Sequence, residues 1–207
     1  MNKEDKFVIT ISRQFGTGGH EIGAELARRL GVKLLDKQIL NEVASRFCAV
    51  EDAVEKIEAR NPLWRDDFTS FYRQYMAGIE YNGQEHDQTS RRLFEAQAEA
   101  IRKIASEESC VLIGRCGFHI FRDHPNALKI FIHADDICRR RRISEKYDIS
   151  DQDAAAMVVD NDYSRELYTK TFTGSDWQDA RNYDVTINVR QFGVNGAVDF
   201  LMKAIEG

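Results

Sequence analysis

The sequence predicts an α/β protein in which a parallel β-sheet is covered by helices on both faces. Short apolar runs rich in β-branched residues, with little or no charge, recur along the chain, as in buried parallel strands. Amphipathic helical patterns alternate with these runs, as in sheets whose strands are joined by crossover helices. The first run is followed by a glycine-rich turn. The length of 207 residues fits one domain, or a core that carries one insertion.

The expected sheet begins with FVITIS at residues 7–12 and continues with VKLL at residues 32–35. Between them, a stripe through Ile22, Leu26 and Leu30 predicts a helix that stops at Gly31, so the chain up to Asp36 forms a βαβ unit. Further strands are expected at residues 110–113, 128–132 and 183–189, which gives five in all. Further helices are expected at residues 136–147, from 150 to about 168, and at 194–205.

Residues 37–108 carry helical patterns with few strand signals. A segment of this length exceeds a simple crossover between two strands, so we interpret it as a helical insertion packed beside the sheet. Within it, aromatic residues recur at mostly helical spacing, which favours core packing and leaves open a role in stacking on a base. These residues are Trp64, Phe68, Phe71, Tyr72 and Tyr75.

Composition narrows the possible ligands. A net charge of −5 argues against binding a nucleic-acid polymer, which usually requires a basic surface. One dense basic cluster at residues 139–142 fits a small anionic ligand better. The sequence shows no signal-peptide pattern and no apolar run long enough to cross a bilayer. The four cysteines form no C-x-x-C motif, so a reducing cytoplasm is the simplest location.

The glycine-rich segment RQFGTGGHE follows the first strand and opens the first helix. Backbone N–H groups in such a turn, together with the positive end of the helix, can bind the oxygens of a phosphate group. Because Gly16, Gly18 and Gly19 stand between a strand and a helix, phosphate binding is favoured over a simple tight turn.

This loop departs from the consensus phosphate-binding sequence G-x-x-x-x-G-K-[ST]. When Gly18 is aligned with the second consensus glycine, Arg13 stands at the first glycine and Gly19 at the lysine. His20 then occupies the Ser/Thr position that would hold Mg²⁺. Arg13 could supply a cation in place of the lysine, and His20 could donate a hydrogen bond to phosphate.

Several polar residues follow the ends of predicted strands. Gly16, Asp36, Arg115 and His133 all lie near carboxyl ends, where ligands of parallel sheets bind. The sequence therefore predicts that these residues converge on one edge of the sheet.

Arginines are the second group of candidate ligands, because phosphoryl transfer needs positive charge placed around the transferred group. Arg139 and Arg142 share one helix face at i, i+3 spacing, although a solvated helix surface would give the same pattern. Arg115 follows the third strand, and Arg165 lies on the next helix near Asp160 and Asp162. One of these aspartates could orient an arginine or a hydrated Mg²⁺.

Four segments together resemble the cytidylate-kinase-like proteins. They are ITISRQFGTGGHEIGAELARRLGVKLLDKQIL, GRCGFHIFRDHPNALKIFIHADDICRRRR, DNDYSR and TGSDWQDARNYDVTIN. The resemblance covers both ends of the chain well and the helical middle poorly. It implies the three-layer P-loop kinase fold of a nucleoside monophosphate kinase, with a five-stranded parallel sheet. It also implies that residues 1–207 are one kinase-like domain, with an acceptor-side insertion at 37–108 and a lid-like helical region at 136–175.

The resemblance further implies an enzyme that uses ATP and Mg²⁺. The arginines expected to act on the transferred phosphoryl group are Arg115, Arg139, Arg142 and Arg165. The residues expected to bind the phosphates of ATP are Arg13, Gly16, Thr17, Gly18, Gly19, His20 and Glu21. Asp36 and Asp162 are expected on the substrate side.

The acceptor is less defined, because the family's residues that follow Asp36 and hold the acceptor are replaced here by KQIL. A nucleoside monophosphate such as CMP or dCMP is expected. Alternatives are a kinase for another small phosphorylated or hydroxylated acceptor, and a non-catalytic nucleotide-binding protein that has lost the loop lysine. Partners are expected to be small nucleotides, with neither nucleic-acid polymer nor membrane, and the oligomeric state is left open.

Overall fold

The computed structural model describes residues 1–36, 91–92 and 94–206. Its centre is a five-stranded sheet with the order β2-β3-β1-β4-β5, in which every described pairing is parallel. The strands are β1 (Val8–Arg13), β2 (Lys33–Leu35), β3 (Cys110–Ile113), β4 (Ala127–His133) and β5 (Val185–Asn188). The α/β fold with a five-stranded parallel sheet, predicted from the apolar runs, is thereby confirmed.

The two faces of the sheet are built by the strict alternation of side chains along β1. Ile9 and Ile11 point to one face, where they pack with Ile22 and Leu26 of helix α1 (Gly19–Leu30) and with Leu201 of helix α8 (Val189–Glu206). The neighbouring residues Val8 and Thr10 point to the opposite face. There, Val8 belongs to a second apolar cluster, which includes residues of the helix at 94–107. Both faces are thus buried, which explains why the strands carry so little charge.

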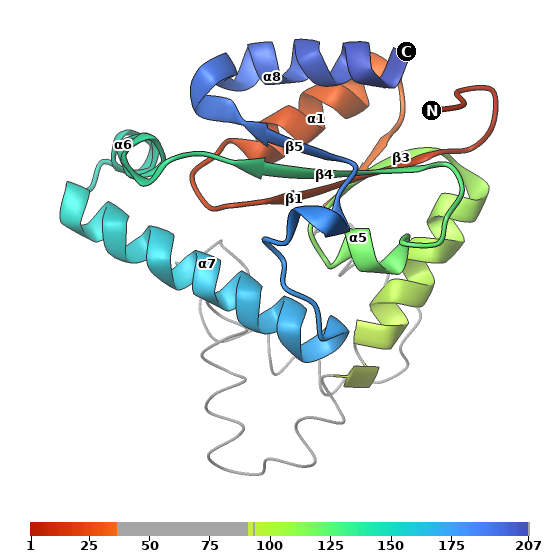
Figure 1. The fold of residues 1–207 in the computed structure, drawn as a ribbon, viewed down its shortest axis with the longest axis horizontal. Helices are drawn as coiled ribbons and strands as arrows, with labels where there is room; N and C mark the ends of the chain where they lie inside the picture. Colours follow the sequence, from red (N-terminus) through yellow and green to blue (C-terminus); the bar gives the residue numbers. More distant parts are fainter. Residues whose placement is uncertain (37–90, 93, 207) are drawn as a thin grey trace.

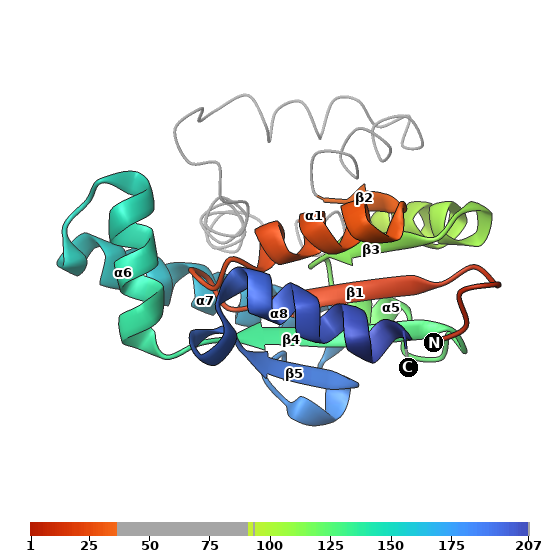
Figure 2. The same cartoon turned by 90° about the horizontal axis from the view of Figure 1, so that it is seen from above.

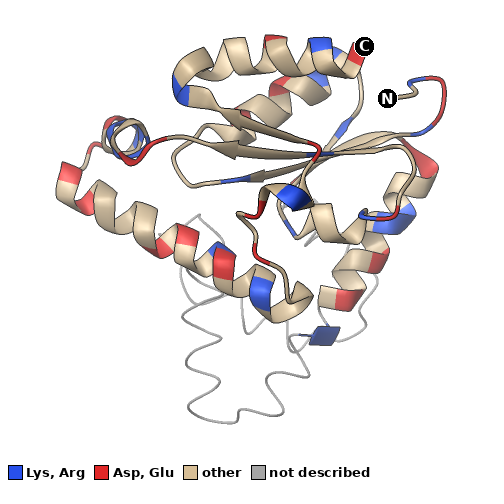
Figure 3. Cartoon of the chain, in the orientation of Figure 1, with Lys and Arg blue, Asp and Glu red and all other residues tan. Residues whose placement is uncertain are grey.

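Helices form a layer on each face of this sheet (Figures 1 and 2). α1 and α8 cover one face, whereas the helix at 94–107 and the short α5 (Gly117–Ile120) cover the other. α6 (Asp136–Tyr147) lies beyond the end of β4, and α7 (Asp151–Thr173) runs back from it toward α5 (Figure 1). Charged residues are distributed over the helices and loops, and the strands are mostly uncharged (Figure 3).

The chain order places a topological switch at the centre of the sheet. β1 continues through α1 to β2, on the side of β3, whereas β4 continues through α6 and α7 to β5 on the opposite side. Neighbouring strands whose connections diverge in this way leave a crevice at their carboxyl ends, where ligands of open α/β sheets bind. The glycine-rich turn after β1 lies at this crevice.

Some element boundaries differ from those predicted. α7 extends to Thr173, beyond the expected end near residue 168, and stops where Gly174 adopts a left-handed conformation. β5 is shorter than the expected strand at 183–189. α8 begins at Val189, but Gly193 has non-helical φ and ψ of 63° and 179°, so its regular part begins near the predicted residue 194. The short helix α5 was not predicted.

The helix at 94–107 agrees with the helical patterns predicted within residues 37–108. Most of the predicted insertion lies outside the described residues, as do its aromatic stripe and Cys48.

Cys110 is fully buried in β3, and this burial raises the pKa of its thiol to about 12, so it is a neutral core residue. None of the described helices combines the length and apolar character that a membrane span requires.

Close packing of α1 against the sheet depends on a glycine. A Cβ atom at Gly23 would overlap Cδ1 of Ile113 and lie 3.1 Å from Cδ1 of Ile11. We expect Gly23→Ala to lower the free energy of unfolding by about 1–3 kcal/mol, measured by urea denaturation, because the core must shift to admit the methyl group. Gly196→Ala is the matched control, since that Cβ would meet only Cβ of Phe192 at 3.4 Å, and it should be neutral or stabilising. Equal effects of the two substitutions would contradict the packing argument.

Candidate active site

The turn between β1 and α1 leaves the N-terminus of α1 open to an anion. Gly16 and Gly18 have φ values of 81° and 76°, which glycine adopts without steric cost. Gly18 is the N-cap of α1, and no side chain of the described residues forms a capping hydrogen bond there. The N–H groups of the first turn are therefore directed to whatever occupies the crevice, in the positive field of the helix end.

Hydrogen bonds within the turn fix its conformation. Gln14 donates its backbone N–H to the carbonyl of Ile132 at 3.0 Å, and its side-chain oxygen accepts from the N–H of Ala134 at 3.2 Å. The hydroxyl of Thr17 donates to the carbonyl of Gln14 at 2.8 Å and is almost fully buried. Thr17 therefore holds the loop together from inside.

A buried ion-pair cluster fastens the loop to the helices α6 and α7. Asp162 of α7 accepts the backbone N–H of Phe15 at 2.7 Å and forms ion pairs with Arg139 and Arg165. Arg139 also donates to the carbonyl of Phe15, and Arg165 to the carbonyl of Arg13, each at 3.4 Å. The guanidinium of Arg165 lies 5.3 Å from the centre of the Phe15 ring. Both arginines are more than nine-tenths buried, so their charges are balanced by Asp162 and by backbone carbonyls in place of water.

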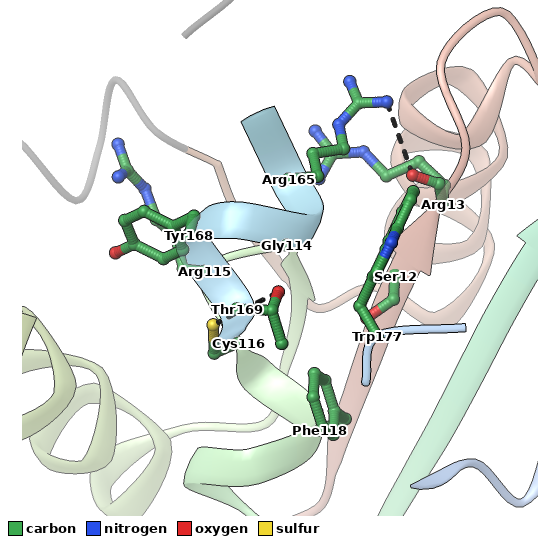
Figure 4. A pocket seen from close by; sticks show the side chains of 10 residues that line it. All are labelled: Ser12, Arg13, Gly114, Arg115, Cys116, Phe118, Arg165, Tyr168, Thr169 and Trp177. Atoms are coloured by element: carbon green, nitrogen blue, oxygen red, sulfur yellow. Dashed lines mark hydrogen bonds between the residues drawn. The ribbon is translucent and has the colours of Figure 1, made fainter. Parts of the chain in front are cut away.

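A pocket opens beside the loop, between the ends of β1 and β3 and the helix α7 (Figure 4). Arg13, Arg115 and Arg165 line it, and their guanidinium groups come from three separate elements. The other lining residues are Ser12, Gly114, Cys116, Phe118, Tyr168, Thr169 and Trp177. Among the described residues that line this pocket there is no carboxylate. Arg165 is paired with Asp162 behind the wall, and Arg13 and Arg115 bring further positive charge to the pocket, which is the arrangement expected of an anion site.

The other titratable groups of the pocket stay neutral. Burial raises the pKa of the Tyr168 hydroxyl and of the Cys116 thiol to about 12 each. The Cys116 thiol contacts the hydroxyl of Thr169 at 3.9 Å. At neutral pH the charge of the described pocket lining is therefore that of its arginines.

The turn that carries Arg115 is conformationally unusual. Gly114, Arg115 and Cys116 have φ values of 72°, 52° and 54°, so three consecutive residues are left-handed. Non-glycine residues in this region cost of order 1–3 kcal/mol each, and such strain is concentrated at functional sites. Its effect here is to place Arg115 over the ring of Tyr168, with Cζ 6.0 Å from the ring centre.

The remaining predicted site residues lie at the rim. His20 and Asp36 form a contact of 3.5 Å between Nε2 and Oδ2, which brings the end of β2 to the start of α1 as expected. Arg142 pairs with Glu21 across the mouth of the loop. The pocket itself contains three of the predicted site residues, which are Arg13, Arg115 and Arg165.

Trp177 is a site residue that the sequence did not reveal. It lies in the loop between α7 and β5, is almost fully buried and lines the pocket, and its indole N–H has no hydrogen-bond partner among the described residues. A tryptophan within the polar segment TGSDWQD was the available signal, because a large apolar residue in such a loop must be packed against something. In the part of the chain that the structure describes, no group of three or more His, Cys, Asp or Glu side chains could hold a metal ion by itself.

The ion-pair cluster gives a stability prediction. Asp162→Asn removes the compensating charge from Arg139 and Arg165, so we expect the free energy of unfolding to fall by about 3 kcal/mol or more in chemical denaturation. Asp123→Asn is the control, because its pairing with Arg122 is exposed and should contribute less than about 1 kcal/mol. A similar, small loss for both variants would show that the cluster does not hold the loop.

Comparison with known proteins agrees with this fold. A cytidylate kinase of Methanosarcina acetivorans is 31% identical over 104 residues, which cover 50% of this chain and 58% of that protein. The match therefore spans little more than half of the curated relative. An uncharacterized protein from Eubacterium ventriosum has a similar structure, with a TM-score of 0.72, 26% identity, and coverage of 97% of this chain and 99% of that one.

The fold is also that of a shikimate kinase from Bacteroides thetaiotaomicron, with a TM-score of 0.51, 12% identity, and coverage of 97% and 99% of the two chains. These likenesses identify the sheet and its helices as a P-loop kinase fold. The model of one protein family matches residues 8–191. This range includes the glycine-rich loop, the turn that carries Arg115, and the arginines of α6 and α7. The chain belongs to the cytidylate kinase-like family.

Proposed function

We propose that the protein is an ATP-dependent phosphotransferase that moves the γ-phosphoryl group of ATP to a nucleoside monophosphate. One observation carries this proposal: the uncapped N-terminus of α1 lies beside a pocket lined by three arginines and, among its described residues, by no carboxylate. The first feature suits the phosphates of a bound nucleotide, and the second suits the charge of a phosphoryl group in transfer. Their adjacency at the carboxyl edge of the sheet is what a kinase requires.

Residue roles follow from this geometry. The backbone of residues 16–19 and the start of α1, including His20 and Glu21, would bind the phosphates of ATP. Arg115 and Arg165 would contact the transferred phosphoryl group from the pocket. Arg139 is buried against Asp162 and the carbonyl of Phe15, so its contribution would be to hold the loop in place. Arg142, at the loop mouth with Glu21, would reach phosphate only by leaving that pair.

Mg²⁺ fits the same site, because this ion usually keeps several waters and needs only one or two carboxylates besides the phosphates. Glu21 of the first turn of α1 is paired with Arg142, so Asp36, which lies beside His20 at the start of the same helix, is the carboxylate that would hold the ion together with the nucleotide. Bound there, Mg²⁺ would neutralise charge on the phosphates.

The acceptor is proposed to be CMP or dCMP, since the family and the curated relative are named for cytidylate kinase. A non-catalytic nucleotide-binding protein is the second candidate, because Gly19 stands where the consensus loop has lysine.

Calorimetric titration with ATP and ADP, together with an assay of ADP release against a panel of nucleoside monophosphates and small hydroxylated acceptors, separates these functions. Binding with turnover on CMP or dCMP is expected. Turnover only on another acceptor would correct the substrate, and tight binding without turnover on any acceptor would establish the non-catalytic alternative.

Arg115→Ala tests the role of the pocket directly. If Arg115 stabilises the transferring phosphoryl group, kcat should fall by about 10³-fold or more, as for other arginines that act on this transition state. Arg122→Ala is the control, since that arginine is 62% exposed and pairs with Asp123 outside the pocket. An Arg115→Ala enzyme with kcat close to that of wild type would remove Arg115 from the mechanism.

A further inference from the structure

Gly19 stands at the position of the consensus lysine, yet its backbone does not require glycine. Gly16 and Gly18 have positive φ values, whereas Gly19 is not among the positive-φ glycines and is the first residue of α1. Other residues are compatible with this conformation, and alanine there would favour the helix. Glycine is therefore required at this position because a side chain would not fit.

The space is occupied by Arg13. A Cβ atom on Gly19 would lie 2.7 Å from Cγ and 2.8 Å from Cβ of Arg13, closer than real Cβ contacts allow. Farther along the same side chain, a Cβ atom on Gly114 would overlap Nη1 of Arg13. The Arg13 side chain thus runs past the first residue of α1 and ends against the turn that follows β3.

We propose that Arg13 takes the place of the missing lysine and binds the terminal phosphate of a nucleoside triphosphate, along a path that Gly19 and Gly114 leave open. This inference rests on the proposed function of the loop and names the residue that performs its cationic role. A lysine at position 19 and the arginine at position 13 exclude each other, because the stem of Arg13 occupies the place where the lysine side chain would begin.

The position of the guanidinium supports this role. Arg13 lines the pocket together with Arg115 and Arg165, and in Figure 4 it is drawn on the same side of the pocket as Arg165. Arg165 donates to the backbone carbonyl of Arg13 at 3.4 Å, so the start of the Arg13 side chain is held by α7. Arg165 is also paired with Asp162, so Arg13 and Arg115 bring positive charge to this pocket beyond that pair, which favours an anionic ligand there.

Arginine at this place differs chemically from lysine. Its planar guanidinium can donate two parallel hydrogen bonds to one phosphate, whereas an ammonium group acts as a compact point charge. Because Arg13 comes from the end of β1 and not from α1, its charge is delivered on the pocket side of the loop. The terminal phosphate would then be shared by the loop backbone and the pocket arginines.

A double-mutant cycle between positions 13 and 19 tests the inference through ATP affinity, measured by calorimetry. Arg13→Ala should weaken ATP binding about tenfold or more, because a charged hydrogen bond is lost. Gly19→Ala should also weaken binding in the wild-type background, since the methyl group displaces Arg13. In the Arg13→Ala background no guanidinium remains to be displaced, so Gly19→Ala should cost much less ATP affinity there, although Cβ of residue 13 still lies 2.8 Å from the added methyl group.

Two further variants sharpen the cycle. Arg13→Gln keeps most of the side-chain stem but removes the charge, so it should lose affinity while its melting temperature stays close to wild type. If Arg13→Ala does not fold, the ATP affinity of Arg13→Gln tests the inference in its place. The double variant Arg13→Gly, Gly19→Lys restores a cation at the consensus position, with no Cβ at residue 13 to obstruct it, and should bind ATP more tightly than Arg13→Gly alone. Arg122→Ala is the control for removal of an exposed arginine.

Wild-type affinity in both Arg13→Ala and Arg13→Gln, or equal losses from Gly19→Ala in both backgrounds, would overturn the inference. Inorganic tripolyphosphate as a second probe reports on the phosphate site without the nucleoside. ATP binding that depends on Arg13, without turnover on any acceptor, would support this inference while the kinase proposal failed. Binding of neither ATP nor tripolyphosphate by the wild-type protein would overturn both.

Discussion

The buried ion-pair cluster around Asp162 is the interaction on which the geometry of the loop depends. One carboxylate accepts the backbone N–H of Phe15 and pairs with Arg139 and Arg165, and both arginines also hold loop carbonyls. Burial of these charges is tolerated only because each has charged or hydrogen-bonding partners inside the protein. As a result, helices far along the chain from β1 fix the turn that follows it, and a change in α6 or α7 is transmitted directly to the loop.

Much of the fold could be predicted because burial on both faces of a parallel sheet leaves a strong pattern. FVITIS and CVLI are strands in the structure, and the stripe through Ile22 and Leu26 packs against the sheet as expected. Element ends were less predictable, because they depend on single backbone conformations. α7 continues until Gly174 turns left-handed, and the four-residue α5 is too short to show a period.

The site was predictable in position and less so in function. Residues that follow strands meet at one edge by topology alone, which is why Gly16, Asp36 and Arg115 could be placed together. Helical spacing could group Arg139 with Arg142, but it could not show that Arg139 is buried against Asp162 while Arg142 pairs with Glu21 at the rim. Those contacts join residues distant in sequence, and no local pattern encodes them. The same holds for Trp177, which reaches the pocket from a loop.

The absence of lysine at position 19 has a different meaning once the structure is considered. Read along the chain, a glycine there is a loss of the phosphate-binding cation. In three dimensions, the same glycine leaves the space that the Arg13 stem occupies, and Gly114 leaves the space for its guanidinium. Three residues distributed over two strand ends and one helix start therefore depend on one another sterically. A loop that obtains its cation from the preceding strand must keep glycine at the start of its helix, so the departure from the consensus is the condition for Arg13 to reach the pocket.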